Sequence, residues 1–198
     1  MGVSKSFLAR FGLTNSDQGA EWIEVSPGRA AILRLEGPRG RLELVVLYLP
    51  TGNARKDRDS LRHTLFPHLC PPNEALTIII GDWNFVTTQT DRLGFADAKW
   101  TDGTDGDEHK EWRNELLDPL SLQEVWQEEV THQTTLGSSR LDRAYANFHV
   151  AEQLYAGWST TPLPWCKSLS THRPILVIRR TDSANAGCKR TLSQFAAL

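Results

Sequence analysis

Short segments of alternating or continuous apolar residues dominate the first half of the chain, and this spacing is typical of β-strands. Residues 21–25 and 29–35 form two such segments, and the Ser-Pro-Gly sequence between them predicts a turn that joins them as a hairpin. Residues 42–48 and 76–80 are apolar on both faces of an extended chain. We therefore predict that they are central strands, covered on both sides of a sheet.

Apolar residues recur at helical spacing in two other stretches. Those within residues 61–69 predict an amphipathic helix over about 55–67, and those within 112–120 predict a second helix that ends near Pro119. The polar stretch 87–107 between them is predicted to be a long surface loop. Further strands are predicted at residues 132–135, 140–145, 155–159 and 175–179.

The length of the chain, 198 residues, suits one domain, which we assign to residues 1–180. Hydrophobic residues make up 39% of the sequence, which excludes an intrinsically disordered or fibrous chain. From Thr181 onward the composition turns to Ser, Ala, Lys and Gly without a periodic apolar face. Residues 181–198 are therefore predicted to be a disordered tail.

The charge balance and the cysteine content limit the range of functions and compartments that suit this protein. The 22 basic and 24 acidic residues nearly cancel, so any contact with a polyanion has to be local. No apolar run approaches the 18 or more residues of a membrane-spanning helix. The 3 widely spaced cysteines argue against a disulfide framework and favour a reducing, intracellular compartment. One local basic cluster would contact a nucleic-acid backbone or form an ordinary charged helix face; it consists of Arg55, Lys56, Arg58 and Arg62.

Polar residues follow directly on the second buried strand, in the sequence Gly81-Asp82-Trp83-Asn84. The side chains of Asp82 and Asn84 are expected to share one face of the extended chain. A carboxylate there can hold a nucleophilic water while a carboxamide bonds a phosphate oxygen, as phosphodiester hydrolysis requires. A turn capped by Asp and Asn explains the same residues equally simply, so this motif alone leaves both interpretations open.

Two later motifs carry further candidate chemistry. In residues 139–145 (Ser-Arg-Leu-Asp-Arg-Ala-Tyr), Arg140 and Asp142 are predicted to share one face of a strand, and a buried Asp needs a partner. Residues 170–175 (Ser-Thr-His-Arg-Pro-Ile) place His172 just before the last predicted strand. A single histidine is usually structural, so the significance lies in the order of the three motifs.

Taken together, the motifs resemble those of the endonuclease/exonuclease/phosphatase superfamily, and most closely those of the endonuclease domains of non-LTR retrotransposons. The similarity covers about residues 20–180 and is carried by Tyr48-Leu49-Pro50 and by the three motifs above, in the family's order. The resemblance implies an α/β protein with the DNase I-like fold. This fold is a four-layer sandwich in which two β-sheets pack face to face with helices outside.

The resemblance also implies a chemistry, namely Mg²⁺-dependent attack of water on a phosphodiester, with Mn²⁺ as an alternative ion and DNA as the substrate. In it, Asp82 orients or deprotonates the water and Asn84 bonds a phosphate oxygen. His172, oriented by Asp142, stabilises the charge of the transition state. Asp82 and Asn84 are also the candidate metal ligands. The implied substrate-binding residues are Tyr48, Asn53 and Arg140.

The sequence departs from the family pattern at two points. The middle residue of the closing motif, usually Asp, is Thr171, which removes one acidic group. The family's first strands carry an Asn and a metal-binding Glu, and we expect this chain to lack them. Glu21 and Glu24 lie on an early predicted strand, but their surroundings resemble the hairpin that follows the Glu strand in the family.

Three functions stay open at this point. The first is a DNA-nicking endonuclease of a retroelement. The second is a phosphatase or phosphodiesterase acting on an inositol phosphate or a lipid head group, because the same motifs serve both classes. The third is a catalytically inert remnant or binding module of the same fold, which Thr171 and the missing Glu strand favour. A monomer is expected in each case.

Overall fold

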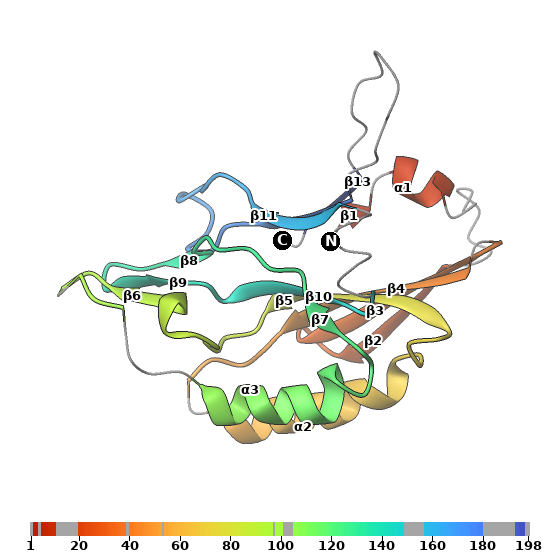
Figure 1. Cartoon of the computed structure of the whole chain (residues 1–198), viewed down its shortest axis with the longest axis horizontal. Coiled ribbons are helices and arrows are strands. Elements are labelled where there is room, and N and C mark those ends of the chain that lie inside the picture. The colour runs from red at the N-terminus through yellow and green to blue at the C-terminus, as the bar shows by residue number, and fades with distance from the viewer. Residues whose placement is uncertain are drawn as a thin grey trace, which may run out of the picture.

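The computed structural model describes residues 2–3, 5–10, 20–38, 40–52, 54–96, 98–100, 105–148, 157–179 and 193–196. These residues form a large and a small β-sheet stacked on one another, with the two longest helices beneath the large sheet (Figure 1). A third, three-stranded sheet extends from one end of the stack. No helix among the described residues is both long and apolar enough to cross a membrane.

The large sheet contains the strands that the apolar pattern predicted. Its strands, in spatial order, are β2 (Ala20–Ser26), β3 (Ala30–Gly37), β4 (Gly40–Tyr48), β5 (Ala75–Asp82), β10 (Asp142–Ala146) and β7 (Gln123–Glu124). The β2–β3 hairpin and the central positions of β4 and β5 are thereby confirmed. β4 and β5 run parallel, whereas β5 and β10 run antiparallel.

β4 and β5 are buried on both faces because two separate cores lie above and below them. Leu44 and Ile78 pack in the core between the two stacked sheets, whereas Leu47 and Ile79 pack in the core toward the helices. The alternation of side chains along a strand thus explains why these segments are apolar at most positions on both faces. Gly81, the residue before the end of β5, lies where the backbone of Leu47 leaves no space for a side chain.

Two helices cover the lower face of the large sheet, as predicted. α2 (Arg55–Leu65) continues into a 3-10 turn (Phe66–His68), and α3 (Gly106–Trp112) continues into a π-helical turn (Arg113–Leu117). Trp83 lies fully buried among Trp112, Phe85 and Tyr145 in the core between these helices and the sheet. Trp83, the motif residue between Asp82 and Asn84, therefore packs in the core.

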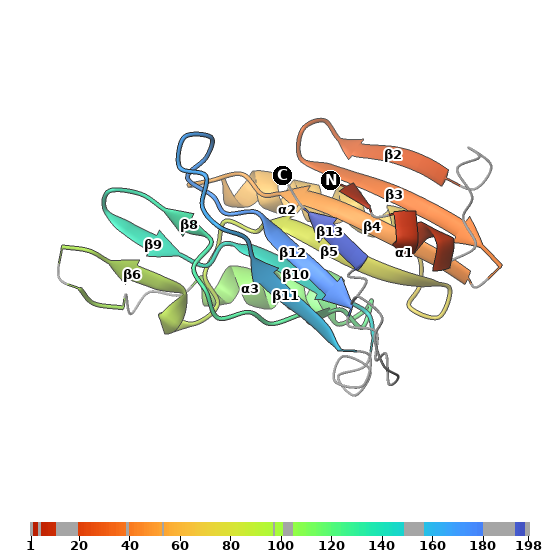
Figure 2. The ribbon, with the colours of Figure 1, turned by 90° about the horizontal axis from the view of Figure 1, so that it is seen from above.

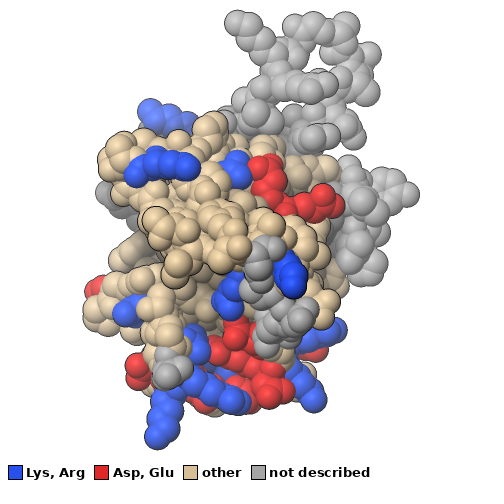
Figure 3. Space-filling model, turned by 90° about the vertical axis from the view of Figure 1, so that its left-hand side faces the viewer, with Lys and Arg blue, Asp and Glu red and all other residues tan. Residues whose placement is uncertain are grey.

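The basic cluster on α2 turns out to be an ordinary charged helix face. Its arginines pair with acidic side chains of α3 and the π-helical turn: Arg55 with Glu111, Arg58 with Glu108 and Arg62 with Glu115. Figure 3 shows charges of both signs gathered over this helical layer at the bottom of the molecule. These cations are neutralised within the protein, so the interpretation as a nucleic-acid contact loses its support.

The small sheet lies across the large one (Figure 2). Its order is β1 (Gly2–Val3), β13 (Ser193–Ala196), β12 (Ile175–Arg179) and β11 (Trp158–Pro162), and α1 (Lys5–Arg10) lies beside it. β13 falls within the segment predicted to be a disordered tail, so that prediction is wrong for residues 193–196. Backbone pairing with β12 and β1 orders them although they carry no apolar period. Residues 180–192 lie outside the described residues.

The third sheet occupies part of the segment predicted to be a surface loop. β6 (Arg92–Gly94) pairs with β9 (Gly137–Ser139), which in turn pairs with β8 (His132–Gln133). The strands are short and polar, and their backbone hydrogen bonds hold them without an apolar face. The two-sheet sandwich with helices outside is confirmed; among the described residues, the helical layer is that of α2 and α3, with α1 next to the small sheet.

Candidate active site

A row of candidate functional side chains lies where β4 and β5 end and β10 begins. Tyr48 on β4 is the register partner of Asp82 on β5, and Asp82 is the register partner of Asp142 on β10. Partners in register present their side chains on the same face. This row therefore points toward the small sheet, from which the segment before β12 brings His172.

His172 lies between the two aspartates. Its Nδ1 atom is 3.0 Å from the Oδ2 atom of Asp142, and its Nε2 atom is 3.7 Å from the Oδ2 atom of Asp82. All three side chains are largely buried, with exposed fractions of 30% for His172, 11% for Asp82 and 14% for Asp142. The structure thus brings together the predicted catalytic residues from three separate motifs.

The environment changes the acidity of two of these groups. Burial, together with the negative charge of Asp142, raises the pKa of Asp82 to about 6, against the opposing effects of His172 and Asn84. The hydrogen bond with Asp142 raises the pKa of His172 despite its burial. Perturbed pKa values in a shared cleft are typical of functional sites.

Asn84 supports Asp82 from the following turn. Its backbone N–H donates to Asp82 Oδ1 at 3.0 Å, and its Nδ2 donates to Asp82 Oδ2 at 3.0 Å and to the carbonyl of Leu49 at 2.7 Å. A φ of 48° brings the side chain back toward the strand it follows. Both amide protons are therefore used within the protein, and the predicted donation to a phosphate oxygen would break one of these bonds. Oδ1 of Asn84 stays available as an acceptor.

A pocket of about 450 Å³ opens over this row of side chains. Asp82, Asp142 and His172 line its polar end, and apolar residues including Leu169 and Ile175 line the rest. Tyr48 also lines the pocket and is 43% exposed. The predicted substrate-binding position of Tyr48, next to the acidic centre, is therefore compatible with the structure.

Asn53, a predicted substrate-binding residue, and Thr171, a departure from the family pattern, have different outcomes. Asn53 lies outside the described residues. Thr171, which replaces the family's usual Asp, has an exposed side chain, while its carbonyl accepts hydrogen bonds from the backbone N–H of Gln133 at 3.0 Å and from Trp165 Nε1 at 3.4 Å. Thr171 thus contributes its backbone to the position of His172.

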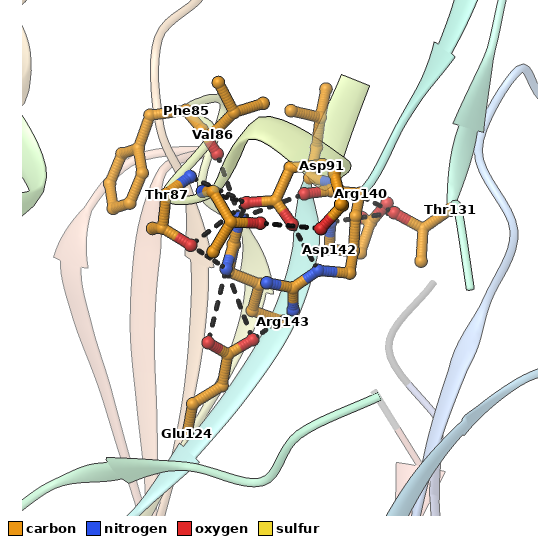
Figure 4. Close-up of polar contacts among 12 residues, drawn as sticks. Phe85, Val86, Thr87, Asp91, Glu124, Thr131, Arg140, Asp142 and Arg143 are labelled. Carbon is orange, nitrogen blue, oxygen red and sulfur yellow. Dashed lines mark hydrogen bonds and ion pairs between the residues drawn. The ribbon is translucent and has the colours of Figure 1, made fainter. Parts of the chain in front are cut away.

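Arg140 is not available to a substrate, contrary to the sequence-based prediction. Its guanidinium is 2% exposed and binds Asp91 at 2.7 Å as well as Glu124, beneath the ring of Trp126. Arg143 is bound to Asp91 at 2.7 Å and to Glu124 at 3.3 Å (Figure 4). The two arginines and two acids form a buried ion network next to Asp142.

Asp91 is the centre of this network. Its Oδ2 accepts hydrogen bonds from the N–H groups of Thr87 and Thr88 and from Arg143, and its Oδ1 accepts one from Arg140. Burial alone would raise the pKa of Asp91, but the charge of Arg143 and these hydrogen bonds outweigh it and hold the pKa well below its usual value. The network therefore fixes an ionised carboxylate under the start of β10.

Thr131 joins the two halves of the site, and no sequence signal pointed to it. Its fully buried hydroxyl accepts hydrogen bonds from the N–H groups of Leu141 at 3.1 Å and Asp142 at 2.9 Å. Its carbonyl accepts one from the N–H of Arg173 at 2.6 Å. One residue thus fixes the backbone at Asp142 and the backbone next to His172.

Replacing Thr131 with valine is expected to lower the free energy of unfolding by about 1–3 kcal/mol, because two buried N–H groups lose their acceptor while the side-chain volume is kept. Thr131→Ser retains the hydroxyl and serves as the matched control, with a clearly smaller loss. Urea unfolding of the three proteins measures the difference. Equal losses in both variants would show that packing of the γ-methyl group, and not the hydroxyl, matters at this position.

The cluster also fits a divalent cation. Asp82, Asp142 and His172 each offer a ligand atom, and these atoms lie within 4.8 Å of one another. Two neighbouring carboxylates, one with a raised pKa, favour a cation between them. Hard divalent ions prefer oxygen, and Oδ1 of Asn84 adds a further oxygen, in line with the predicted ligands Asp82 and Asn84.

Comparison of the sequence with protein-family models and with curated proteins finds no match. Comparison of the fold with solved structures does. The endonuclease domain of TRAS1, a telomere-specific non-LTR retrotransposon, matches with a TM-score of 0.55 and 14% identity, over 86% of this chain and 73% of that domain.

Two further structures match less closely. An endonuclease/exonuclease/phosphatase family protein from Leptotrichia buccalis gives a TM-score of 0.49 and 14% identity, over 75% of this chain and 52% of that protein. TDP2 of D. rerio, humanized by 14 mutations, gives a TM-score of 0.48 and 18% identity, over 79% of this chain and 63% of that protein. This chain therefore spans between about half and two thirds of the length of these two proteins. The sheet order and the similarity to the TRAS1 domain show that the chain has the DNase I-like fold.

Proposed function

We propose that this protein is a metal-assisted phosphodiesterase that nicks DNA. The observation that carries the proposal is the position of His172 between two carboxylates, Asp82 and Asp142, that come from neighbouring strands of the other sheet. This arrangement provides a proton acceptor, a hydrogen-bond donor and an acidic site for a cation within one pocket.

In the proposed reaction, water attacks phosphorus and the bond from phosphorus to the leaving oxygen breaks. The leaving oxygen takes a proton from solvent, which gives a phosphate monoester and a hydroxyl group. Asp82 accepts the proton of the attacking water, held in position by Asn84. Asp142 fixes the ring of His172, so that Nε2 carries a proton toward the pocket and stabilises charge on the phosphate oxygens. Tyr48 contacts the phosphate from the neighbouring strand.

The metal would be held by Asp82 and Asn84, with Asp142 beside them. When bound, a divalent ion such as Mg²⁺ or Mn²⁺ neutralises charge on the phosphate and polarises it. It also offsets the repulsion between the two carboxylates. The family's usual Glu and Asp are not among the residues that the structure places here, so the proposed site relies on fewer acidic ligands.

DNA is the proposed substrate because the TRAS1 domain, which matches this fold with a TM-score of 0.55, is an endonuclease. The competing substrate class is an inositol phosphate or lipid head group. A single compact head group needs no contacts beyond the pocket, whereas a polynucleotide extends past it on both sides. The two classes are therefore distinguishable by which substrate the protein cleaves.

The test is nicking of supercoiled plasmid by the full chain in Mg²⁺, in Mn²⁺ and in EDTA, alongside phosphate release from an inositol polyphosphate. We expect nicking in either metal, none in EDTA and no phosphate release. Release of phosphate without nicking would replace the proposed substrate class. Absence of both activities in a folded sample, while a TRAS1-type endonuclease domain cuts under the same conditions, would support the inert binding module instead.

A further inference from the structure

Most arginines whose side chains the structure describes are neutralised by carboxylates. Those in ion pairs are Arg34, Arg41, Arg55, Arg58, Arg62, Arg113, Arg140, Arg143 and Arg173. Arg29 and Arg92 are the arginines with described side chains that form no ion pair with a carboxylate. Because the protein as a whole has a slightly acidic balance, two uncompensated guanidinium groups near one site stand out.

Arg29 extends the row of site residues by one strand. It lies directly before β3, and its carbonyl accepts a hydrogen bond from the N–H of Tyr48 at 2.8 Å. Its guanidinium lies over the ring of Tyr48, 4.7 Å from the centroid, and its Nη1 atom is buried without a hydrogen-bond partner. Arg29 thus continues, directly before β3, the row that Tyr48, Asp82 and Asp142 form on β4, β5 and β10.

The spacing of this row suits a chain of phosphates. Neighbouring strands lie about 4.8 Å apart, so Arg29 is displaced by about 10 Å from the strand of Asp82. A nucleic-acid strand rises about 3.4 Å per nucleotide. A phosphate two to three nucleotides from the scissile one would therefore lie near Arg29. Asp57 lines the shallow pocket next to Arg29, so the favourable side for an anion is the side toward Tyr48.

Arg92 occupies the opposite side of the centre. It lies on β6, where its register partner is Ser139 of β9, and Ser139 is in turn the partner of His132 on β8. The ring of His132 packs against that of His172, with 4.5 Å between the centroids. The positive charge of Arg92 reaches this pair, because it helps to lower the pKa of His132, after burial and His172.

We propose that Arg29 and Arg92 bind backbone phosphates on either side of the scissile phosphate, so that the ligand of this site is an extended polynucleotide rather than a compact phosphorylated head group. The inference rests on the proposed function and names its substrate class. In Figure 2 the β2–β3 hairpin and β6 flank the end of β5 on opposite sides. A DNA strand crossing the site in this direction meets one cation before the acidic centre and one after it.

The test measures binding of a fluorescein-labelled 20-base-pair DNA duplex to the full chain in EDTA, over a range of NaCl concentrations. Each phosphate contact contributes about 0.9 to the slope of log K against log[salt]. Arg29→Ala and Arg92→Ala are each expected to weaken binding and to reduce the slope by about 0.9, and the double variant by about 1.8. Arg113→Ala, which removes an exposed arginine paired with Asp118 on the helical layer, is the control and leaves the slope unchanged.

A second readout uses bis(4-nitrophenyl) phosphate, a diester with a single phosphate. This substrate has no flanking phosphates, so each variant is expected to raise the KM for plasmid by a clearly larger factor than the KM for bis(4-nitrophenyl) phosphate. An unchanged salt slope in both variants, or no binding of the duplex by the wild type, would overturn the inference. Failure of the wild type to hydrolyse either substrate would overturn the proposed function alone, because the salt slope still decides whether the two arginines bind DNA.

Discussion

Asp82→Asn is expected to lower the rate of metal-dependent plasmid nicking by about a thousandfold, while the protein stays folded. The substitution keeps the size of the side chain and its acceptor oxygen but removes the negative charge and the ability to take a proton. Both the proton acceptor and a candidate metal ligand are lost in one step. Initial rates of nicking at fixed Mg²⁺, together with circular dichroism of the variant, measure the effect.

Asp118→Asn is the matched control for this experiment. It makes the same chemical change at an exposed acid on the helical layer, 55% exposed and paired with Arg113, and is expected to leave the rate unchanged. The double variant Asp82→Asn/His172→Ala should be little slower than Asp82→Asn alone, because groups that act as a unit do not have additive effects. Retention of more than a tenth of the wild-type rate in Asp82→Asn would exclude Asp82 as the proton acceptor.

Asp91→Asn is expected to lower the free energy of unfolding at pH 7 by about 3–5 kcal/mol, the largest loss of stability predicted for a single change here. The variant leaves Arg140 and Arg143 buried with only Glu124 to neutralise them, and buried charges without partners are strongly destabilising. Urea unfolding measures the loss. Asp118→Asn again serves as the control, because an exposed ion pair contributes at most about 1 kcal/mol.

Asp91 also makes the stability of the folded protein depend on pH, with stability lost toward low pH. The pKa of Asp91 is lower in the folded protein than in the unfolded chain, where it has its ordinary value of 3.8. Its contribution is therefore complete above about pH 4 and is lost as the pH falls through the folded-state value. The wild type should lose stability below about pH 4, whereas Asp91→Asn should lack this part of the decline. Parallel pH profiles of the two proteins would contradict the assignment.

The central strands of the fold could be predicted because a strand that is buried on both faces is apolar on both faces. Residues 42–48 and 76–80 are apolar at most positions, since one core lies above them and another below. The short sequences of β6 and β13 show no such apolar pattern. They are held by backbone pairing at the periphery, where polar side chains are tolerated, so their sequences are those of loops.

The candidate site could be predicted in part, for a similar reason. Asp82, Asp142 and His172 were identified from the order of three motifs, and the structure brings them together. The position of Arg140 could not be predicted, because β9 ends at Ser139 and β10 begins only at Asp142. The interruption ends the strand alternation, so Arg140 points into the Asp91 network although it is two residues from Asp142.

Thr131 shows a different limit of the sequence. Its role depends on the meeting of three segments, those around Thr131, Asp142 and Arg173, and only the folded chain brings them into hydrogen-bonding distance. A threonine in a polar stretch carries no local signal of that kind. Long-range backbone contacts to a single hydroxyl are therefore visible only in three dimensions.

The pairing of β1 with β13 has a consequence for the order in which the candidate site forms. Gly2 and Val3 pair with Ala196 and Phe195, so the small sheet joins segments that lie far apart in the sequence. The hairpin strands β2, β3 and β4, by contrast, pair with their neighbours in sequence. Contacts between distant segments form late, because closing a long loop is slow. His172 lies just before a strand of the small sheet, whereas Asp82 and Asp142 lie on the large one, so we expect the two aspartates to be paired before His172 joins them.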